Sequence, residues 1–116
     1  MKTIEIQKGS HIEFMSRELL FLSKSNQPYR GVVYISFKSK GKSFNLKDLK
    51  KYITSLRDKT FYSEDIAYEI YQQINNSIKS KKLGVIVDIT SRGGIAQRIR
   101  FGKKFKPTKK DNIFQI

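Results

Sequence analysis

The hydrophobic positions of residues 61–78 repeat at helical spacing and predict the longest helix of the chain. The apolar positions form one stripe along this stretch, made by Ile66, Ile70, Ile74 and Ile78. A stripe at this period faces a core. Ser63 is the predicted N-cap, and Glu64 and Asp65 place negative charge in the first turn, where the helix dipole favours it. The predicted helix therefore has a buried face and an acidic N-terminal end.

A second apolar stripe predicts a shorter helix over residues 47–58. Leu49, Ile53 and Leu56 fall on one face of this stretch, whereas its lysines fall elsewhere. Such a pattern is typical of an amphipathic helix of about three turns. The basic run at residues 80–82 follows the longer helix and is expected to stabilise its C-terminal end.

Alternation of apolar and polar residues predicts the strands. The clearest strand covers residues 29–38, where Val33, Ile35 and Phe37 share one face. The other strands that precede or follow the helices are predicted over residues 43–45, 83–90 and 95–101, with a glycine turn at 91–94.

The N-terminal part of the chain predicts a hairpin over residues 1–15. Apolar residues alternate in residues 1–6 and again in 11–15, and Gly9 and Ser10 break the pattern between them. Residues 17–23 fit either a helical turn or a buried strand. The cluster of small and polar residues from Ser23 to Pro28 predicts a loop.

The order strand, strand, helix, helix, strand, strand predicts the fold class α+β. Two hairpins with both helices between them form an antiparallel sheet that is covered by two helices on one face. We expect residues 1–102 to form this single domain and residues 103–116 to form a basic C-terminal tail.

The net charge of the chain indicates the kind of partner that it binds. The chain carries 24 Lys and Arg against 10 Asp and Glu, for a net charge of +14. This excess predicts a polyanionic partner such as tRNA or another nucleic acid, although a solvated lysine-rich surface would give the same composition. The predicted nucleic-acid-binding residues lie on the last strand and its extension: Arg98, Arg100, Lys103, Lys104 and Lys106. Phe101 and Phe105 are interleaved with them and could stack on bases, while Phe101 also fits a core position.

The composition excludes several kinds of chemistry. The chain has no cysteine and only one histidine, His11, which excludes disulfides and cysteine nucleophiles and argues against a metal site. No apolar run approaches the roughly 20 residues that span a bilayer, and the first residues lack the layout of a signal peptide. We therefore expect a cytoplasmic protein without metal and without a membrane partner.

Several short motifs occur in register over roughly residues 21–102. They are Gln27-Pro28 before the strand VYISF, the helix run LKKYITSLR, the tetrapeptide YSED at residues 62–65, and SRGGI at residues 91–95. In this order and spacing they resemble the tunnelling fold of the QueF-type 7-cyano-7-deazaguanine reductases and of the archaeal QueF-like amidinotransferases. The resemblance implies a ββααββ domain that forms a homo-oligomeric barrel, with ligand sites between subunits.

The resemblance also implies a base-binding role for Glu64. In this family a glutamate here accepts hydrogen bonds from a ring N–H and an amino group of a purine-like base, which two carboxylate oxygens suit. Glu64 equally fits a role in stabilising the helix N-terminus. Ser63, Gln27, Arg92 and Gly93 are the other substrate-binding candidates, although Gln27 also fits a loop and Gly93 a hairpin turn.

This sequence departs from the family pattern at the positions that carry the family's catalytic chemistry. The family's catalytic cysteine corresponds to Leu22, its proton-donating aspartate to Tyr29, and its NADPH-associated run to residues 45–48, which keep only a lysine. Leucine offers no nucleophile, so the family's covalent intermediate cannot form. Ser23 is a weak nucleophile without an adjacent base. We expect no NADPH cofactor, and the catalytic residues stay unknown.

Two functions remain open from the sequence. The first is a QueF-like protein of 7-deazaguanine modification, of the queuosine or archaeosine type, that recognises the base within tRNA, alone or as a subunit that assists another enzyme. The second is a non-catalytic nucleic-acid-binding or structural protein on the same oligomeric fold.

Overall fold

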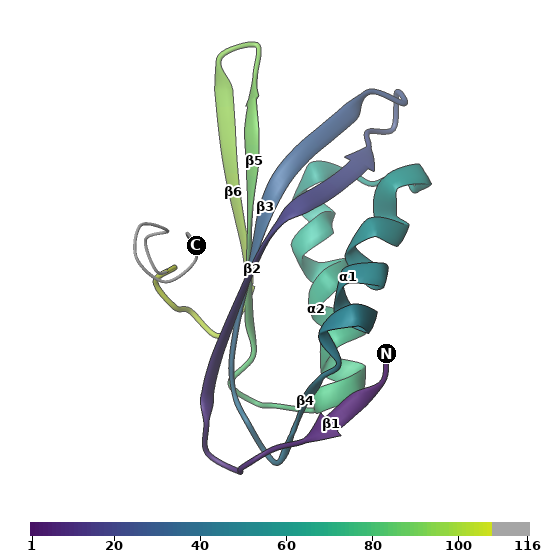
Figure 1. Ribbon diagram of the computed structural model, residues 1–116. Helices are drawn as coiled ribbons and strands as arrows, with labels where there is room; N and C mark the ends of the chain where they lie inside the picture. The colour runs from purple at the N-terminus through teal and green to yellow at the C-terminus, as the bar shows by residue number, and fades with distance from the viewer. Residues whose placement is uncertain (108–116) are drawn as a thin grey trace.

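A four-stranded antiparallel sheet carries both helices on one of its faces (Figure 1). The computed structural model describes residues 1–107, apart from the side chains of residues 91 and 92. The sheet has the strand order β2-β3-β5-β6. Its strands are β2 (His11–Leu22), β3 (Pro28–Lys38), β5 (Gly84–Arg92) and β6 (Ile95–Gly102). The α+β class and the antiparallel sheet covered on one face are confirmed.

Residues 17–23, which fitted a helical turn or a strand, extend β2 as far as Leu22. A register shift between Ser16 and Leu19 divides the pairing of β2 with β3. Beyond this bulge, Leu19 and Phe21 are buried against the helices. The long strand therefore supplies core residues in its second half.

The predicted N-terminal hairpin is wrong. β1 (Thr3–Glu5) pairs with β4 (Lys42–Phe44) in a separate two-stranded sheet, with Thr3 opposite Phe44. Backbone hydrogen bonds hold β1 against β4 at both ends: the Ile6 N–H donates to the Gly41 carbonyl oxygen at 3.0 Å, and the Asn45 N–H donates to the Lys2 carbonyl oxygen at 3.2 Å. Phe44 is buried and packs edge-on against Phe37 at 6.1 Å between ring centroids, which anchors the small sheet to the core.

The first helix follows the sequence prediction closely. α1 (Leu46–Thr54) continues as a 3-10 turn, η1 (Ser55–Asp58), and together they cover the predicted range. Asn45 is the N-cap, and its side chain accepts a hydrogen bond from the backbone N–H of Lys47.

The second helix begins later than predicted. α2 (Ile66–Ile78) is preceded by a 3-10 turn, η2 (Ser63–Asp65), so Ser63 lies inside that turn and does not cap the helix. Asp65 takes the N-cap position without a side-chain hydrogen bond. At the other end the last turn holds no basic residue, and the helix stops because Lys79 adopts a left-handed conformation (φ 49°).

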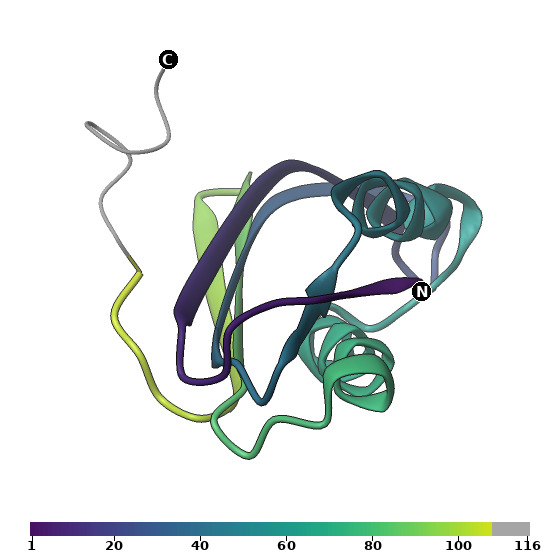
Figure 2. The same cartoon turned by 60° about the horizontal axis from the view of Figure 1, so that its bottom comes forward.

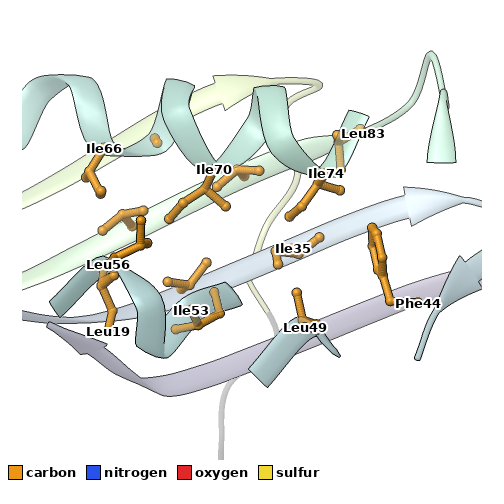
Figure 3. Close-up of a cluster of buried hydrophobic side chains, with 14 of the residues drawn as sticks. Leu19, Ile35, Phe44, Leu49, Ile53, Leu56, Ile66, Ile70, Ile74 and Leu83 are labelled. Atoms are coloured by element: carbon orange, nitrogen blue, oxygen red, sulfur yellow. The ribbon is translucent and has the colours of Figure 1, made fainter. Parts of the chain in front are cut away.

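The core lies between the helices and the sheet (Figure 3). Ile66, Ile70 and Ile74 of α2 are fully buried and point toward the sheet, as their spacing predicted. Ile35 of β3 and Leu49 of α1 meet them from the other sides of the same cluster. Each such side chain contributes about 1.5–3 kcal/mol by leaving water. None of the helices in the described part of the chain is long and apolar enough to cross a membrane.

Three turns meet at the end of the sheet where β3 finishes (Figure 2). The Ser80 hydroxyl donates to the Lys38 carbonyl oxygen at 2.9 Å and accepts from the Lys82 backbone N–H at 3.2 Å. The backbone N–H of Gly9 donates to the Ser39 carbonyl oxygen at 2.9 Å. These bonds join the β1–β2, β3–β4 and α2–β5 connections.

Removing the Ser80 hydroxyl is predicted to destabilise the fold. Ser80 is 3% exposed, so Ser80→Ala leaves the Lys38 carbonyl and the Lys82 N–H without this partner. We expect the free energy of unfolding to fall by about 1–3 kcal/mol. Urea denaturation followed by circular dichroism measures this change.

Tyr52→Phe is the matched control, because it removes a hydroxyl that has no hydrogen-bond partner among the described residues. Burial, reinforced by Glu69, raises the pKa of Tyr52, so its phenol stays neutral. This variant is expected to unfold at the same or higher urea concentration. Equal losses in the two variants would contradict the structural role of Ser80.

Candidate functional site

A cleft of about 300 Å³ opens beside the start of α2. It is formed by the loop after β2, the start of β3, the 3-10 turn η2 with the segment that leads into it, and the facing parts of β5 and β6. The residues that line it are Ser23, Lys24, Tyr29, Phe61, Tyr62, Ser63, Glu64, Ile89, Thr90, Ile95 and Gln97.

Backbone pairing brings the two halves of the cleft together. The N–H of Leu22 donates to the Lys59 carbonyl, and the N–H of Phe61 donates to the Leu22 carbonyl, both at 2.9 Å. Leu22 and Thr60 thus form a parallel bridge at the end of β2. The chain that leads into η2 is held beside the loop that follows β2.

Glu64 presents an ionised carboxylate to the cleft. The amide Nε2 of Gln97 donates to Glu64 Oε2 at 3.0 Å. Its own backbone N–H, then the Gln97 amide, and also the Ser63 hydroxyl lower the pKa of Glu64 below its usual value. The side chain is exposed, so a ligand can reach the carboxylate.

Aromatic side chains give the cleft flat walls. Tyr29 and Phe61 line it and both pack on the buried ring of Phe21, at 5.3 and 6.1 Å between centroids. Tyr62 lies at the rim with Lys24 Nζ 5.2 Å from its ring centroid. Rings held in this way suit a planar ligand.

The other predicted substrate-binding residues are placed differently. Ser63 lines the cleft, whereas Gln27 lies outside the described lining residues and closes the loop after β2 through its backbone. Its N–H donates to Ser23 Oγ at 3.1 Å. Gly93, with φ 60°, sits in the β5–β6 turn. The side chain of Arg92 lies outside what the structure describes.

The predicted nucleic-acid-binding residues of β6 and its extension, here called the basic stripe, include two arginines that already have partners. Arg98 donates two hydrogen bonds to the Asp88 carboxylate, at 2.6 and 2.7 Å, and these bonds raise the pKa of Arg98. Arg100 donates to the Phe105 carbonyl oxygen at 2.8 Å. The remaining members of the stripe are exposed: Lys103, Lys104 and Lys106. Residues 108–116 of the predicted tail lie outside the described residues.

Phe101 belongs to an aromatic cluster with α2. Its ring meets Tyr68 and Tyr71 edge-on, each at 4.9 Å between centroids, while 39% of the residue stays exposed. Phe105 is half-buried near Gly84. Both rings therefore contribute packing at the β6 edge.

Gln97 is the site residue that the sequence analysis missed. It lies opposite Ile89 on β6, so strand alternation places it on the helix-bearing face with Ile99. The alternation was visible in the sequence, but its contact with Glu64 depends on how α2 crosses the sheet.

The one hydroxyl of the loop after β2 that lines the cleft is engaged within that loop. The Ser23 hydroxyl accepts from the backbone N–H groups of Ser25 and Gln27 and shares a hydrogen bond with the Ser25 hydroxyl at 3.0 Å. No imidazole or carboxylate bonds to it in the described part of the chain. The described residues also contain no cluster of His, Cys, Asp and Glu that could hold a metal ion.

Comparison with known proteins identifies the family. The model of the family described as "QueF-like protein" matches residues 28–108. This chain belongs to the QueF-like family. Two relatives named NADPH-dependent 7-cyano-7-deazaguanine reductase come from Wolinella succinogenes and Helicobacter acinonychis. The first is 32% identical over 81 residues and the second 38% identical over 72 residues.

The QueF-like chain matches only part of these relatives. The matches cover 70% of this chain and 65% of the Wolinella protein, and 62% of this chain and 49% of the Helicobacter protein. A solved structure titled "archaeosine synthase QueF-Like in the apo form" superposes with a TM-score of 0.77 at 15% identity. The superposition covers 87% of this chain and 100% of that one, which confirms the tunnelling fold.

Replacing Gln97 is predicted to raise the pKa of Glu64 part of the way to its usual value. In Gln97→Ala the amide donor is lost, but the backbone N–H, which lowers the pKa most, remains. A ¹³C NMR titration of the Glu64 carboxyl carbon measures the shift. An unchanged titration would contradict the bond between Gln97 and Glu64.

Proposed function

We propose that this QueF-like protein takes part in 7-deazaguanine modification and recognises a 7-deazaguanine base, carried in tRNA, through Glu64. The observation that carries the proposal is the ionised Glu64 carboxylate on a cleft with aromatic walls. The names of its relatives, which are 7-cyano-7-deazaguanine reductases, support the choice of base.

The proposed recognition uses both oxygens of one carboxylate. A guanine-type edge offers a ring N–H and an amino group side by side, and a carboxylate accepts one hydrogen bond from each of two such donors. Gln97 holds Glu64 from the β6 side and so fixes the direction in which the carboxylate faces. Tyr29 and Phe61 supply flat surfaces on which the base can stack.

The family's nitrile chemistry is not part of the proposal. The position of the family's cysteine nucleophile is Leu22, and the position of its aspartate is Tyr29, which lines the cleft as an aromatic wall. We propose a protein that binds the modified base without NADPH, either alone or as a subunit that presents it to another enzyme.

We further propose that the working form is a homo-oligomer. Ile95 and Tyr62 line the cleft although they are 69% and 60% exposed, so the cleft leaves apolar surface open to water. β6 is also an edge strand of the sheet, with backbone groups available for pairing. A second copy against this edge would cover the rim and complete the site.

The alternative function is nucleic-acid binding or a structural role without base recognition. The observation that favours it is the net charge of +14, which does not depend on the cleft. The two functions differ in whether ligand binding depends on Glu64.

Replacing Glu64 is predicted to weaken base binding. Glu64→Gln keeps the shape but removes the charge, so the affinity for 7-cyano-7-deazaguanine should fall at least about tenfold, as loss of a charge-assisted hydrogen bond implies. Isothermal titration calorimetry measures the affinity. The wild-type affinity should hold as the pH falls until it reaches the pKa of Glu64, which its backbone N–H and the Gln97 amide hold below the usual value for a glutamate, where protonation removes an acceptor.

Asp65→Asn is the matched control, since it removes the same charge one residue later, on an exposed side chain outside the described cleft lining. This variant should bind the base as the wild type does. If the two variants bind equally, recognition through Glu64 is wrong and the alternative function stands.

A further inference from the structure

A second concave site lies at the end of the molecule opposite Glu64. It has a volume of about 370 Å³, at the lower end of the range of ligand pockets. Three connections form it: β1–β2, β3–β4 and α2–β5. Figure 2 shows these three turns side by side at the near end of the sheet. We call it the lysine pocket after the residues that share it, Lys8, Lys38, Lys40, Lys81 and Lys82.

The lysine pocket concentrates charge of one sign. Its lining contains five lysines and no Asp or Glu among the described residues. The five lysines come from three separate parts of the chain, and all of them border this one hollow. A concave site with one sign of charge focuses the field and attracts an anion.

Hydrogen bonds hold the three turns in place. The Ser80 hydroxyl ties the α2–β5 turn to the Lys38 carbonyl oxygen. The backbone of Ser39 is bonded on both sides to the β1–β2 turn, by Gly9 N–H at 2.9 Å and to the Ser10 carbonyl oxygen at 2.8 Å. The lysine backbones are therefore positioned before any ligand arrives, which reduces the entropy that binding must remove.

The exposed lysines that follow β6 leave the sheet at the same end of the molecule as the lysine pocket. Lys103 N–H donates to the Leu83 carbonyl oxygen at 2.8 Å, directly after the α2–β5 turn. Lys104 and Lys106 follow on the surface. By contrast, the Arg98 guanidinium is neutralised by the Asp88 carboxylate. Among the described residues, positive charge without an acidic partner is thus greater here than along the outer face of β6.

We propose that the lysine pocket binds phosphate groups of a nucleic-acid backbone. The inference rests on the part of the proposed function that makes tRNA the carrier of the base. α2 has 13 residues and separates the two sites, which at 1.5 Å per residue is about 20 Å. The pocket therefore contacts phosphates some distance from the modified nucleotide, so it selects a folded nucleic acid over a free base.

The test compares two triple variants that remove the same charge. The first replaces the exposed pocket residues, Lys40→Gln, Lys81→Gln and Lys82→Gln. The control replaces three exposed lysines of α1, Lys47→Gln, Lys50→Gln and Lys51→Gln. The affinity for an unmodified tRNA transcript is measured by fluorescence anisotropy at several salt concentrations. Thermal unfolding checks that both variants are folded.

The pocket variant should bind tRNA at least about tenfold more weakly, and the slope of log K against log salt should fall by about three. The control variant should change the affinity less than about threefold. Equal losses in both variants would overturn the proposal, because they would report net charge alone. Unchanged tRNA binding by the pocket variant would also overturn it.

One further arm separates this proposal from base recognition. The pocket variant should bind free 7-cyano-7-deazaguanine as the wild type does, because its three lysines do not line the cleft that contains Glu64. If the protein binds no free base but the pocket variant still loses tRNA binding, the proposal for the lysine pocket is supported while base recognition through Glu64 is not. A pocket variant that loses the free base but keeps tRNA would overturn the assignment of phosphates to this end.

Discussion

The packing of one face of α2 against the sheet determines where both candidate sites lie. Ile66, Ile70 and Ile74 are fully buried, and together they fix the rotation of the helix and its position along the sheet. The helix ends are then set as well, with Glu64 before the first turn and Lys79 after the last. The same apolar contact therefore places an anionic group at one end and a basic turn at the other.

This arrangement separates two kinds of recognition. At the N-terminal end of α2, one carboxylate and aromatic walls suit a neutral planar base, which needs directed hydrogen bonds. At the other end, several lysines in a hollow suit phosphate charge, which needs no particular sequence. A protein with both ends could hold a modified nucleotide and the nucleic acid that carries it, even without the family's cysteine.

The sequence predicted those helices and strands whose positions follow from residues close together in the chain. The stripe of α2 and the alternation of β3 were correct because burial on one face dictates both. Contacts between distant segments were not predicted. β1 pairs with β4 rather than with its neighbour, and Gln97 reaches Glu64 only because β6 lies beside the start of α2. The lysine pocket needed three turns to be placed together, and no spacing along the chain encodes that.

The most direct test of the central claim is a crystal structure of the protein with 7-cyano-7-deazaguanine. The account predicts the base in the cleft, with its ring N–H and amino group each within hydrogen-bond distance of a Glu64 oxygen, and with a second copy of the chain closing the rim beside Ile95. A base bound elsewhere, or an empty cleft at saturating base, would contradict recognition through Glu64.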